Sequence, residues 1–343
     1  MTITMRDRYR GAMVGTECGD SLLAAYEWMW TPEQIAVDME ARGGLVPHEY
    51  EPFDYVEPFK GRRTIKKGQP TDDSELSAAL ALSLIEKKSL DEEDVYNRLR
   101  AFIVDRKSIL TERAYGSGRT LRAALDAPTY RESVARFEAG IIPTPPSNGS
   151  LMRCVAVPLA FGNQEYPNGC RNSEILTSVA IWQSMVTHRN SSALWACVAY
   201  SHMVKYVLLG NAPANAWSKT RVEMAGWFEK PEAELKEIVD IDLSKPDYER
   251  DMKGSEPGNN KFGWVVLSLR AALWASIEAT DFADGIIKVG RLGGDTDTYG
   301  AIAGGILGAH FGIQGIPEHW LNVLQGRDIM IDLADKLYNI AHS

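Results

Sequence analysis

Apolar residues along most of the chain recur at every third or fourth position, which is the spacing of one face of an α-helix. Leu76, Leu80 and Leu84 indicate a helix that begins near Thr71 or Asp72. Further predicted helices carry apolar stripes at Val95, Leu99, Phe102 and Ile103, at Ile175, Val179, Trp182 and Val186, at Val266, Leu269, Leu273 and Ile277, and at Ile302, Ile306 and Ala309. Alternating apolar and polar runs bounded by hairpin turns are nearly absent. The pattern therefore predicts an all-α fold.

Polar residues before these stripes are suitable helix N-caps. Asp91 precedes the second predicted helix, and Asn172 and Ser173 precede the third. The last stripe is different, because small residues crowd the segment Gly300–Gly308. Since a helix without bulky side chains lets a neighbouring backbone approach closely, we expect tight helix packing here.

Two segments interrupt the helical pattern. Residues 43–70 contain several prolines and are first acidic and aromatic, then basic, whereas residues 229–261 are charged and end in a Gly-Ser-Glu-Pro-Gly run. Both are typical of long surface excursions within one domain spanning residues 1–343. Such loops serve as lids or recognition surfaces about as often as they serve as solvated connections. Because residues 43–70 lead into Thr71, we expect them over or beside any site there.

Composition narrows the class of protein. The apolar fraction of 45% and the charged fraction of 24% are those of an ordinary soluble globular protein. The net charge of −9 disfavours a non-specific nucleic-acid binder, which needs a basic face, and a binder of anionic membranes. The scattered cysteines Cys18, Cys154, Cys170 and Cys197 form no zinc motif, and the start resembles no signal peptide. We expect a cytoplasmic protein that does not span a membrane.

Acidic residues gather at three places that also hold glycine or a hydroxyl side chain. The first is Gly19-Asp20 followed by Glu27, the second is Thr71-Asp72-Asp73-Ser74, and the third is Gly293-Gly294-Asp295-Thr296-Asp297-Thr298. Each cluster alone has an ordinary structural explanation, because acidic residues complement helix N-termini and Gly-Gly-Asp is a common turn.

The three clusters together indicate a metal centre. Adjacent Asp72 and Asp73 reach one site only from the end of a helix, and Asp295 and Asp297 converge in the same way from a turn. Carboxylate and hydroxyl oxygens suit hard cations such as Mg²⁺ or Mn²⁺ rather than zinc. Without a cation, four such carboxylates would repel one another and take up protons. We therefore expect two divalent ions, which can activate water and orient a substrate diol.

Six sequence blocks resemble, in order, those of the ADP-ribosylglycohydrolase family over nearly the whole chain. They are Arg10-Gly11 through Glu27, Thr71–Ser74, Ser147-Asn148-Gly149-Ser150-Leu151-Met152-Arg153, Thr187-His188, Gly263-Trp264-Val265-Val266, and Gly293–Thr298 with Gly312 and Ile316-Pro317 behind. Each block alone is weak, because short motifs recur by chance, whereas six in order are specific. The chain departs from the family pattern at Ser74, where Thr is common, and at Trp264, where Tyr is usual.

The resemblance implies a compact, single-domain, all-α fold with a binuclear Mg²⁺ site between helices. Thr71, Asp72 and Asp73 match the ligands of one ion. Asp295 and Thr298 match the ligands of the other, with Asp297 bridging the two.

The resemblance also implies roles for residues around the metals. Glu27 matches an acidic residue implicated in acid–base catalysis. Asn148, Gly149 and Ser150 match the block that contacts the distal ribose and the diphosphate, where backbone amides near a helix start suit a phosphate. His188 matches a ligand-contacting position, Trp264 is placed to stack on adenine, and Arg153 is expected to be a structural pairing residue.

The implied activity is hydrolysis of the bond between ADP-ribose and a modified protein side chain. Arginine is favoured, because the chain resembles the arginine-directed bacterial branch and its acidic balance suits a cationic leaving group. The implied partners are an ADP-ribosylated protein and the ADP-ribosyltransferase that it opposes, such as a toxin against which it serves as an immunity factor. Two alternatives stay open: a two-metal hydrolase of a free ADP-ribose derivative or phosphoester, and a non-catalytic ADP-ribose binder.

Overall fold

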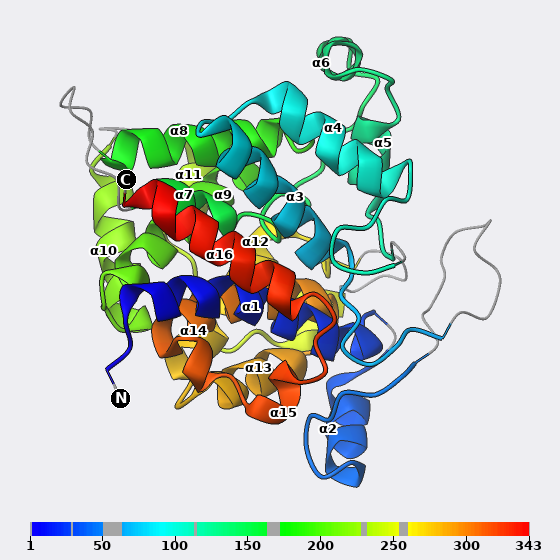
Figure 1. The fold of residues 1–343 in the computed structure, drawn as a ribbon, viewed down its shortest axis with the longest axis vertical. Helices are drawn as coiled ribbons and strands as arrows, with labels where there is room; N and C mark the ends of the chain where they lie inside the picture. The colour runs from blue at the N-terminus through cyan, green and yellow to red at the C-terminus, as the bar shows by residue number, and fades with distance from the viewer. Residues whose placement is uncertain are drawn as a thin grey trace.

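Two glycine-rich helices lie side by side at the centre of the protein, α1 (Met5–Leu23) and α14 (Thr296–Phe311) (Figure 1). This computed structural model describes residues 2–28, 30–50, 64–112, 115–162, 172–227, 232–253 and 260–342. The two helices run antiparallel and meet through glycines, so that a Cβ atom on Gly15 would lie 2.3 Å from the carbonyl oxygen of Gly304. The tight packing predicted for Gly300–Gly308 is confirmed, and it brings the end of α1 beside the start of α14.

Other helices surround this pair. Helices that pack directly against one or both members of the pair are α3 (Asp72–Lys87), α9 (Ser191–Leu208), α12 (Val265–Glu278), α13 (Phe282–Gly290) and α16 (Arg327–Ala341). The remaining helices are α2 (Pro32–Ala41), α4 (Glu92–Ile103), α5 (Arg119–Leu125), α6 (Tyr130–Glu138), α7 (Ala156–Phe161), α8 (Asn172–Met185), α10 (Pro213–Ala225), α11 (Ala233–Val239) and α15 (Glu318–Leu321). Short helical turns lie between these helices at η1 (Ala24–Tyr26), η2 (Tyr248–Lys253) and η3 (Ile313–Gly315).

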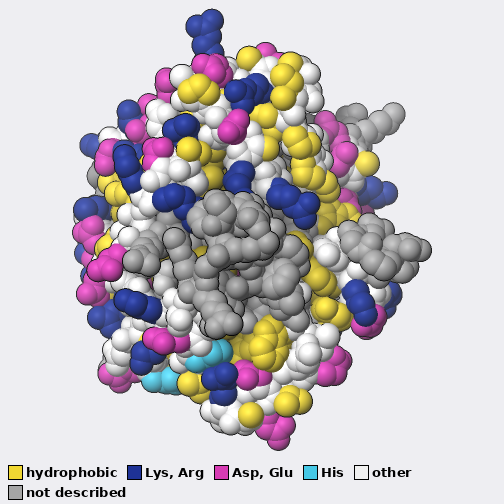
Figure 2. All heavy atoms as spheres, turned by 90° about the vertical axis from the view of Figure 1, so that its right-hand side faces the viewer, with side chains coloured by type: hydrophobic (Ala, Val, Ile, Leu, Met, Phe, Trp, Pro, Cys, Tyr) yellow, Lys and Arg dark blue, Asp and Glu magenta, His cyan; other side chains and the backbone are white. Residues whose placement is uncertain are grey.

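The all-α prediction is confirmed for the part of the chain that the structure describes, where extended pairing is limited to two isolated bridges. One large apolar core joins helices from both ends of the chain, as expected for a single domain. Within the described ranges, no helix combines the length and apolarity needed to cross a membrane. Charged side chains of both signs are spread over the visible part of the face in Figure 2.

Helix starts follow the predicted caps. Thr71 caps α3, and its hydroxyl accepts a hydrogen bond from the backbone N–H of Asp73 at 3.3 Å. Asp91 caps α4 in the same way, accepting from the N–H of Asp94. The start of α8 lies one residue earlier than a cap at Asn172 would place it, because Asn172 is already helical.

The segment 229–261 differs from the predicted surface excursion where the structure describes it. It contains α11 and η2, and Leu235, Ile238 and Met252 are fully buried against the core. Apolar residues spaced three apart in a charged stretch are enough to dock one face of a short helix.

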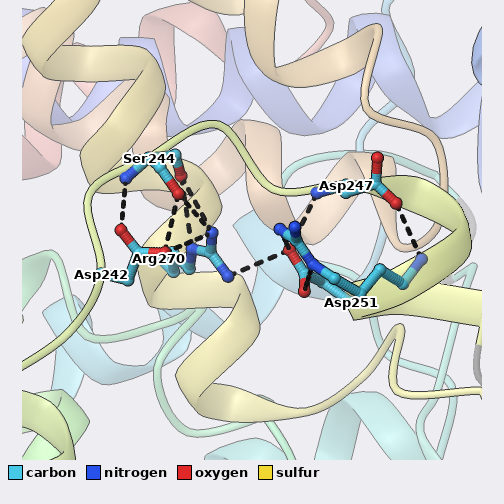
Figure 3. Close-up of polar contacts among 6 residues, drawn as sticks. Asp242, Ser244, Asp247, Asp251 and Arg270 are labelled. Carbon is cyan, nitrogen blue, oxygen red and sulfur yellow. Dashed lines mark hydrogen bonds and ion pairs between the residues drawn. The ribbon is translucent and has the colours of Figure 1, made fainter.

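An arginine on α12 holds this segment in place (Figure 3). The guanidinium of Arg270 pairs with Asp242 at 3.0 Å and with Asp251 at 3.1 Å, and it also donates to Ser244. Arg250 and Arg270 together hold the pKa of Asp251 well below its ordinary range. The segment is therefore fixed against α12 by charge-assisted contacts as well as by its buried apolar residues.

Only the two ends of the segment 43–70 lie within the described residues. Tyr50 and Ile65 join these ends through two backbone hydrogen bonds of 3.1 and 2.8 Å. Ile65 is buried, and a few residues later the chain enters α3 at Asp72. Residues 64–70 thus lead directly into the second acidic cluster at the start of α3, and the placement of the segment over or beside the site stays a prediction.

Candidate active site

Five buried aspartates meet where α1 ends and where α3 and α14 begin. They are Asp20, Asp72, Asp73, Asp295 and Asp297, none of which is more than 8% exposed. The glycine contacts between α1 and α14 set this meeting point, because they align the last turn of one helix with the first turn of the other. The structure therefore brings together the three acidic clusters that are far apart in the sequence.

Asp20 fastens the start of α3 to α1. Its carboxylate accepts hydrogen bonds from the backbone N–H and the hydroxyl of Thr71, the latter at 2.8 Å. It also accepts from the N–H and the hydroxyl of Ser74. These contacts satisfy backbone donors that the first turn of a helix leaves unpaired, and they orient Asp72 and Asp73 toward the shared site.

Two donors hold Asp295 from opposite sides. The indole N–H of Trp28 donates to Oδ1 at 3.1 Å, and the amide of Asn148 donates to Oδ2 at 2.7 Å. Asn148 itself is tied to the Ser268 hydroxyl of α12 at 2.9 Å. The orientation of the carboxylate is therefore fixed before any ligand arrives.

Glu27 lies against the start of α14. One carboxylate oxygen each of Glu27, Asp295 and Asp297 lies within 4.8 Å of the others, close enough to hold one ion. The backbone supports this arrangement, since the N–H of Trp28 donates to the carbonyl of Gly294 at 2.7 Å. The hydroxyl of Thr298 contacts Asp73 and Asp295 and so joins the two helix starts.

Burial and mutual repulsion make these carboxyl groups weak acids. Burial and the charge of Asp20 raise the pKa of Asp72 to about 7, and burial raises that of Asp20 to about 6. The pKa values of Asp73, Asp297 and Glu27 lie well above their ordinary range for the same two reasons. Carboxylates shifted together in this way are typical of a functional site, because only a cation or protons relieve the repulsion.

The residues predicted to contact the nucleotide line the adjoining region. Ser147 and Trp264 form an isolated bridge, which places Asn148 beside α12 and the start of α14. The ring of His188 lies against Gly149, where a Cβ atom would come within 2.9 Å of it. These residues lie together, on the Asp295 side of the acidic centre.

Ser150 and Arg153 are engaged inside the protein. The Ser150 hydroxyl accepts from Ser184 at 2.7 Å, so its side chain is part of the core. Arg153 is buried and donates to the carbonyl of Gly149 at 3.0 Å and to Gln183, which confirms the structural role expected of it. Burial and the charge of Arg153 hold the pKa of His188 well below its ordinary value, so this ring is neutral at neutral pH.

Trp264 is half-buried at the start of α12, with the ammonium of Lys261 4.7 Å from the centre of its ring. The stacking of the Trp264 ring on adenine stays a prediction. Lys261 is the cation already beside the ring.

Comparison with known proteins identifies the fold and the family. A family model described as ADP-ribosylglycohydrolase matches residues 1–343. The chain belongs to the ADP-ribosylglycohydrolase family. Members of this family hydrolyse ADP-ribosyl linkages, so the acidic centre is the candidate active site of such a hydrolase.

Curated relatives cover almost all of the chain. It is 25% identical over 324 residues to the ADP-ribosyl-[dinitrogen reductase] glycohydrolase of Rhodospirillum rubrum, covering 94% of this chain and 91% of the relative. It is 24% identical over 335 residues to the ADP-ribosylarginine hydrolase Tri1 of Serratia proteamaculans, covering 98% and 80%. It is 27% identical over 359 residues to the human ADP-ribosylhydrolase ARH3, covering 97% and 93%.

A solved structure shares the fold of this family member. It is described as an ADP-ribosylglycohydrolase-related protein complex, and it superposes with a TM-score of 0.69 at 26% identity. The match covers 98% of this chain and 99% of the other.

Sequence reasoning did not assign several residues that the structure places at this active site. Trp28 follows Glu27 directly, but nothing in the sequence shows that its indole reaches Asp295. Gly116 approaches the site so closely that a Cβ atom would lie 2.0 Å from Oδ1 of Asp72. Asp20 belongs to the first acidic cluster, but its position on α1 does not reveal in the sequence that it binds the first turn of α3 to α1.

The donor set of the family site fits divalent cations. Oδ1 of Asp73 is buried and has no hydrogen-bond partner among the described residues, although one partner is ordinarily required. The remaining donors are carboxylate and hydroxyl oxygens, which hard cations prefer. The residues that would hold such ions are the predicted set Thr71, Asp72, Asp73, Asp295, Asp297 and Thr298, together with Glu27 at the edge.

Proposed function

We propose that this protein removes ADP-ribose from an arginine side chain of a modified protein, using two Mg²⁺ ions for which Mn²⁺ can substitute. One observation carries the proposal. Carboxylates from the starts of α3 and α14 converge with Glu27 in one buried site, next to the region formed by Asn148, Gly149 and His188. Such a site accommodates a negatively charged nucleotide on one side and a cationic reaction centre on the other.

The ions would supply Lewis-acid chemistry that offsets the clustered carboxylates, activates water and orients a diol. The side chains supply the rest. The fixed carboxylate of Asp297 stabilises positive charge as it develops at C1″. Since Trp28 and Asn148 already orient Asp295, little reorganisation is needed on binding.

Hydrolysis consumes one water molecule and keeps the total charge constant. The bond from C1″ to the guanidino nitrogen breaks, and a bond from C1″ to the water oxygen forms. Glu27 accepts a proton from the water and returns it to the leaving nitrogen, which regenerates the guanidinium of arginine. Glu27 is suited to this exchange because its half-buried carboxyl group adjoins Asp297 at the edge of the cluster.

The choice of arginine rests on charge and on relatives. An ADP-ribosylated guanidinium is a cation, and an acidic centre attracts it more strongly than it attracts a neutral serine ether. Two similar proteins are named as an ADP-ribosylarginine hydrolase and an ADP-ribosyl-[dinitrogen reductase] glycohydrolase. The relative ARH3 carries no linkage in its name.

The decisive experiment compares substrates under matched conditions. Release of ADP-ribose is measured from an arginine-modified protein, a serine-modified peptide and ADP-ribose 1″-phosphate, with Mg²⁺ or with EDTA. We expect the arginine adduct to be cleaved fastest and EDTA to abolish cleavage. Faster cleavage of serine would overturn the linkage, cleavage of the phosphoester alone would favour the two-metal alternative, and binding without turnover would favour the non-catalytic binder.

This activity implies a partner that attaches the ADP-ribose. We propose an arginine-directed ADP-ribosyltransferase, such as a toxin against which the protein provides immunity. Co-expression with such a transferase should restore growth and remove the modification from its target. A target that stays modified, while the purified protein cleaves arginine adducts, would rule out this partner and leave the hydrolase activity intact.

A further inference from the structure

Tyr50 places a polar atom at the acidic centre from the loop before α3. The hydroxyl oxygen of its half-buried side chain is fully buried, and it has no hydrogen-bond partner among the described residues. A buried hydroxyl without a partner destabilises a protein, so such groups are rare and are commonly explained by a ligand.

The position of Tyr50 is fixed by its backbone. Its N–H and C=O exchange hydrogen bonds with Ile65, whose side chain is buried in the core. The backbone at Tyr50 is therefore held to a residue of the core. Ile65 of this bridge lies six residues before Thr71, where the second acidic cluster begins.

The ionisable groups near the Tyr50 hydroxyl show which part of the protein it lies against. The ionisable groups close enough to act on it are Tyr115, Glu27, Asp297 and Asp20, three of which are the carboxyl groups of the site. Burial raises the pKa of Tyr50 well above its ordinary value and these neighbouring groups raise it further, so the hydroxyl keeps its proton and remains a donor. A buried, unpaired donor close to the carboxyl groups of Glu27 and Asp297 is suited to an oxygen atom of a ligand bound there.

We propose that Tyr50 is a substrate-binding residue whose hydroxyl donates a hydrogen bond to the ribose attached to the protein side chain. This inference rests on the proposed function, because it assumes that this ribose binds at the acidic centre. The adenosine and diphosphate would extend past Asn148 and Gly149, on the Asp295 side. Tyr50 should therefore distinguish a ligand that carries the second ribose from one that lacks it.

Tyr9 provides a matched control. Its hydroxyl is also buried without a partner among the described residues, and its ring packs edge-on against Tyr338 at 5.3 Å. It lies on α1 about three helical turns from Asp20, outside the acidic centre. Removing either hydroxyl should leave the melting temperature unchanged or slightly higher, because each one is unpaired in the ligand-free protein.

The test measures calorimetric affinity for ADP-ribose and for ADP, in the presence of Mg²⁺, for wild type, Tyr50→Phe and Tyr9→Phe. We expect Tyr50→Phe to bind ADP-ribose about fivefold to tenfold more weakly, the effect of losing one hydrogen bond. Its affinity for ADP should stay within about twofold of wild type, and Tyr9→Phe should match wild type for both ligands.

Other outcomes would overturn the inference in distinguishable ways. Unchanged ADP-ribose affinity in Tyr50→Phe, with a wild type that hydrolyses arginine adducts, would refute the contact and leave the proposed function standing. Equal weakening for ADP and ADP-ribose would show that Tyr50 supports the site as a whole. A wild type that neither binds ADP-ribose nor cleaves adducts would refute both proposals.

Discussion

The indole N–H of Trp28 donates to Oδ1 of Asp295 at 3.1 Å, across most of the length of the sequence. Trp28 has a positive φ of 62°, a backbone conformation that residues other than glycine rarely adopt. Such backbone strain persists only where the surroundings hold it, and here the contacts with Gly294 and Phe262 do so. Trp28 directly follows Glu27, so its backbone helps to position Glu27 while its indole orients Asp295.

Trp28→Phe should keep an aromatic ring against Phe262 and lose the N–H donor to Asp295. Because hydrogen-bonded partners of metal ligands tune affinity, we expect Mg²⁺ affinity and kcat to fall by about 10-fold to 100-fold. A Mg²⁺ titration followed by melting temperature and a separate kcat measurement check this. Trp182→Phe, at a 47% exposed position on α8, is the control and should behave as wild type. Normal Mg²⁺ binding by Trp28→Phe would show that Asn148 alone suffices to orient Asp295.

Gly304→Ala should weaken the contact that builds the site. Its new Cβ atom would lie 2.0 Å from the carbonyl oxygen of Gly15, so α1 and α14 must move apart. Overpacking of this kind costs roughly 1–3 kcal/mol, and we expect a lower melting temperature and weaker Mg²⁺ binding together. Gly226→Ala is the control, because its Cβ atom would meet nothing closer than 3.5 Å. A stable Gly304→Ala with normal Mg²⁺ binding would contradict this account of the helix pair.

The helices and the acidic residues at the starts of α3 and α14 follow from local sequence signals. The cap at Thr71 fixes the start of α3, and the carboxylates at a helix start are the residues that local spacing can locate. The glycines of α14 likewise signal close packing, although the sequence does not name α1 as the partner. Local periodicity and motif order were sufficient for these features.

Contacts between distant segments were not accessible in the same way. The bond from Trp28 to Asp295 and the approach of Gly116 to Asp72 depend on tertiary geometry. The helix α11 was missed because its charged residues hide a short apolar face carried by Leu235 and Ile238. A motif also does not show where a side chain points. The motif of Ser150 suggests ligand contact, whereas its hydroxyl accepts a hydrogen bond from Ser184 inside the protein.

Glu17 predicts a specific dependence of stability on pH. Burial raises its pKa from an ordinary 4.5 to about 8, and one of its oxygens has no partner within the described ranges. Between these two pH values the folded protein keeps a proton that the unfolded chain releases. The folded state therefore binds more protons, and its stability falls as the pH rises through this window.

Glu17→Gln removes this titration and keeps an oxygen that can accept from the N–H of Gly326. The variant should gain stability relative to wild type as the pH rises from 5 to about 8. Melting temperatures of both proteins at fixed Mg²⁺ across this range provide the measurement. A difference between them that does not change with pH would mean that Glu17 is ionised in the folded protein.

Mg²⁺ should raise the melting temperature of the wild type, and EDTA should reverse the rise. An ion that binds only the folded state stabilises it by mass action, by about 2.7 kcal/mol at 100 times its dissociation constant. The effect should be larger than in most proteins, because the ions also relieve repulsion among Asp72, Asp73 and Asp297. Melting and hydrolysis that are both insensitive to EDTA would exclude the metal centre.

Asp297 is the most sensitive test of a two-ion centre. It lies at the first turn of α14, with one carboxylate oxygen within 4.8 Å of an oxygen of Glu27 and of Asp295. Burial raises its pKa, and the charges of Glu27 and Asp73 raise it further. Asp297 thus interacts with acidic groups of both helix starts, which is what a residue shared by two ions requires. The family resemblance predicts the same shared role.

Asp297→Ala should remove nearly all hydrolysis and weaken both ions, whereas Thr298→Ala should weaken only one. Calorimetric titration with Mg²⁺ would show two affected sites in the first variant and one in the second. The fold should survive, because removing one of several clustered acids relieves repulsion while it forfeits metal, and circular dichroism should match wild type. Asp297→Asn refines the test, since it keeps the shape and one oxygen but lacks the charge that offsets the ions. Substantial activity of Asp297→Ala at Mg²⁺ concentrations that saturate the wild type would refute a mechanism with two ions.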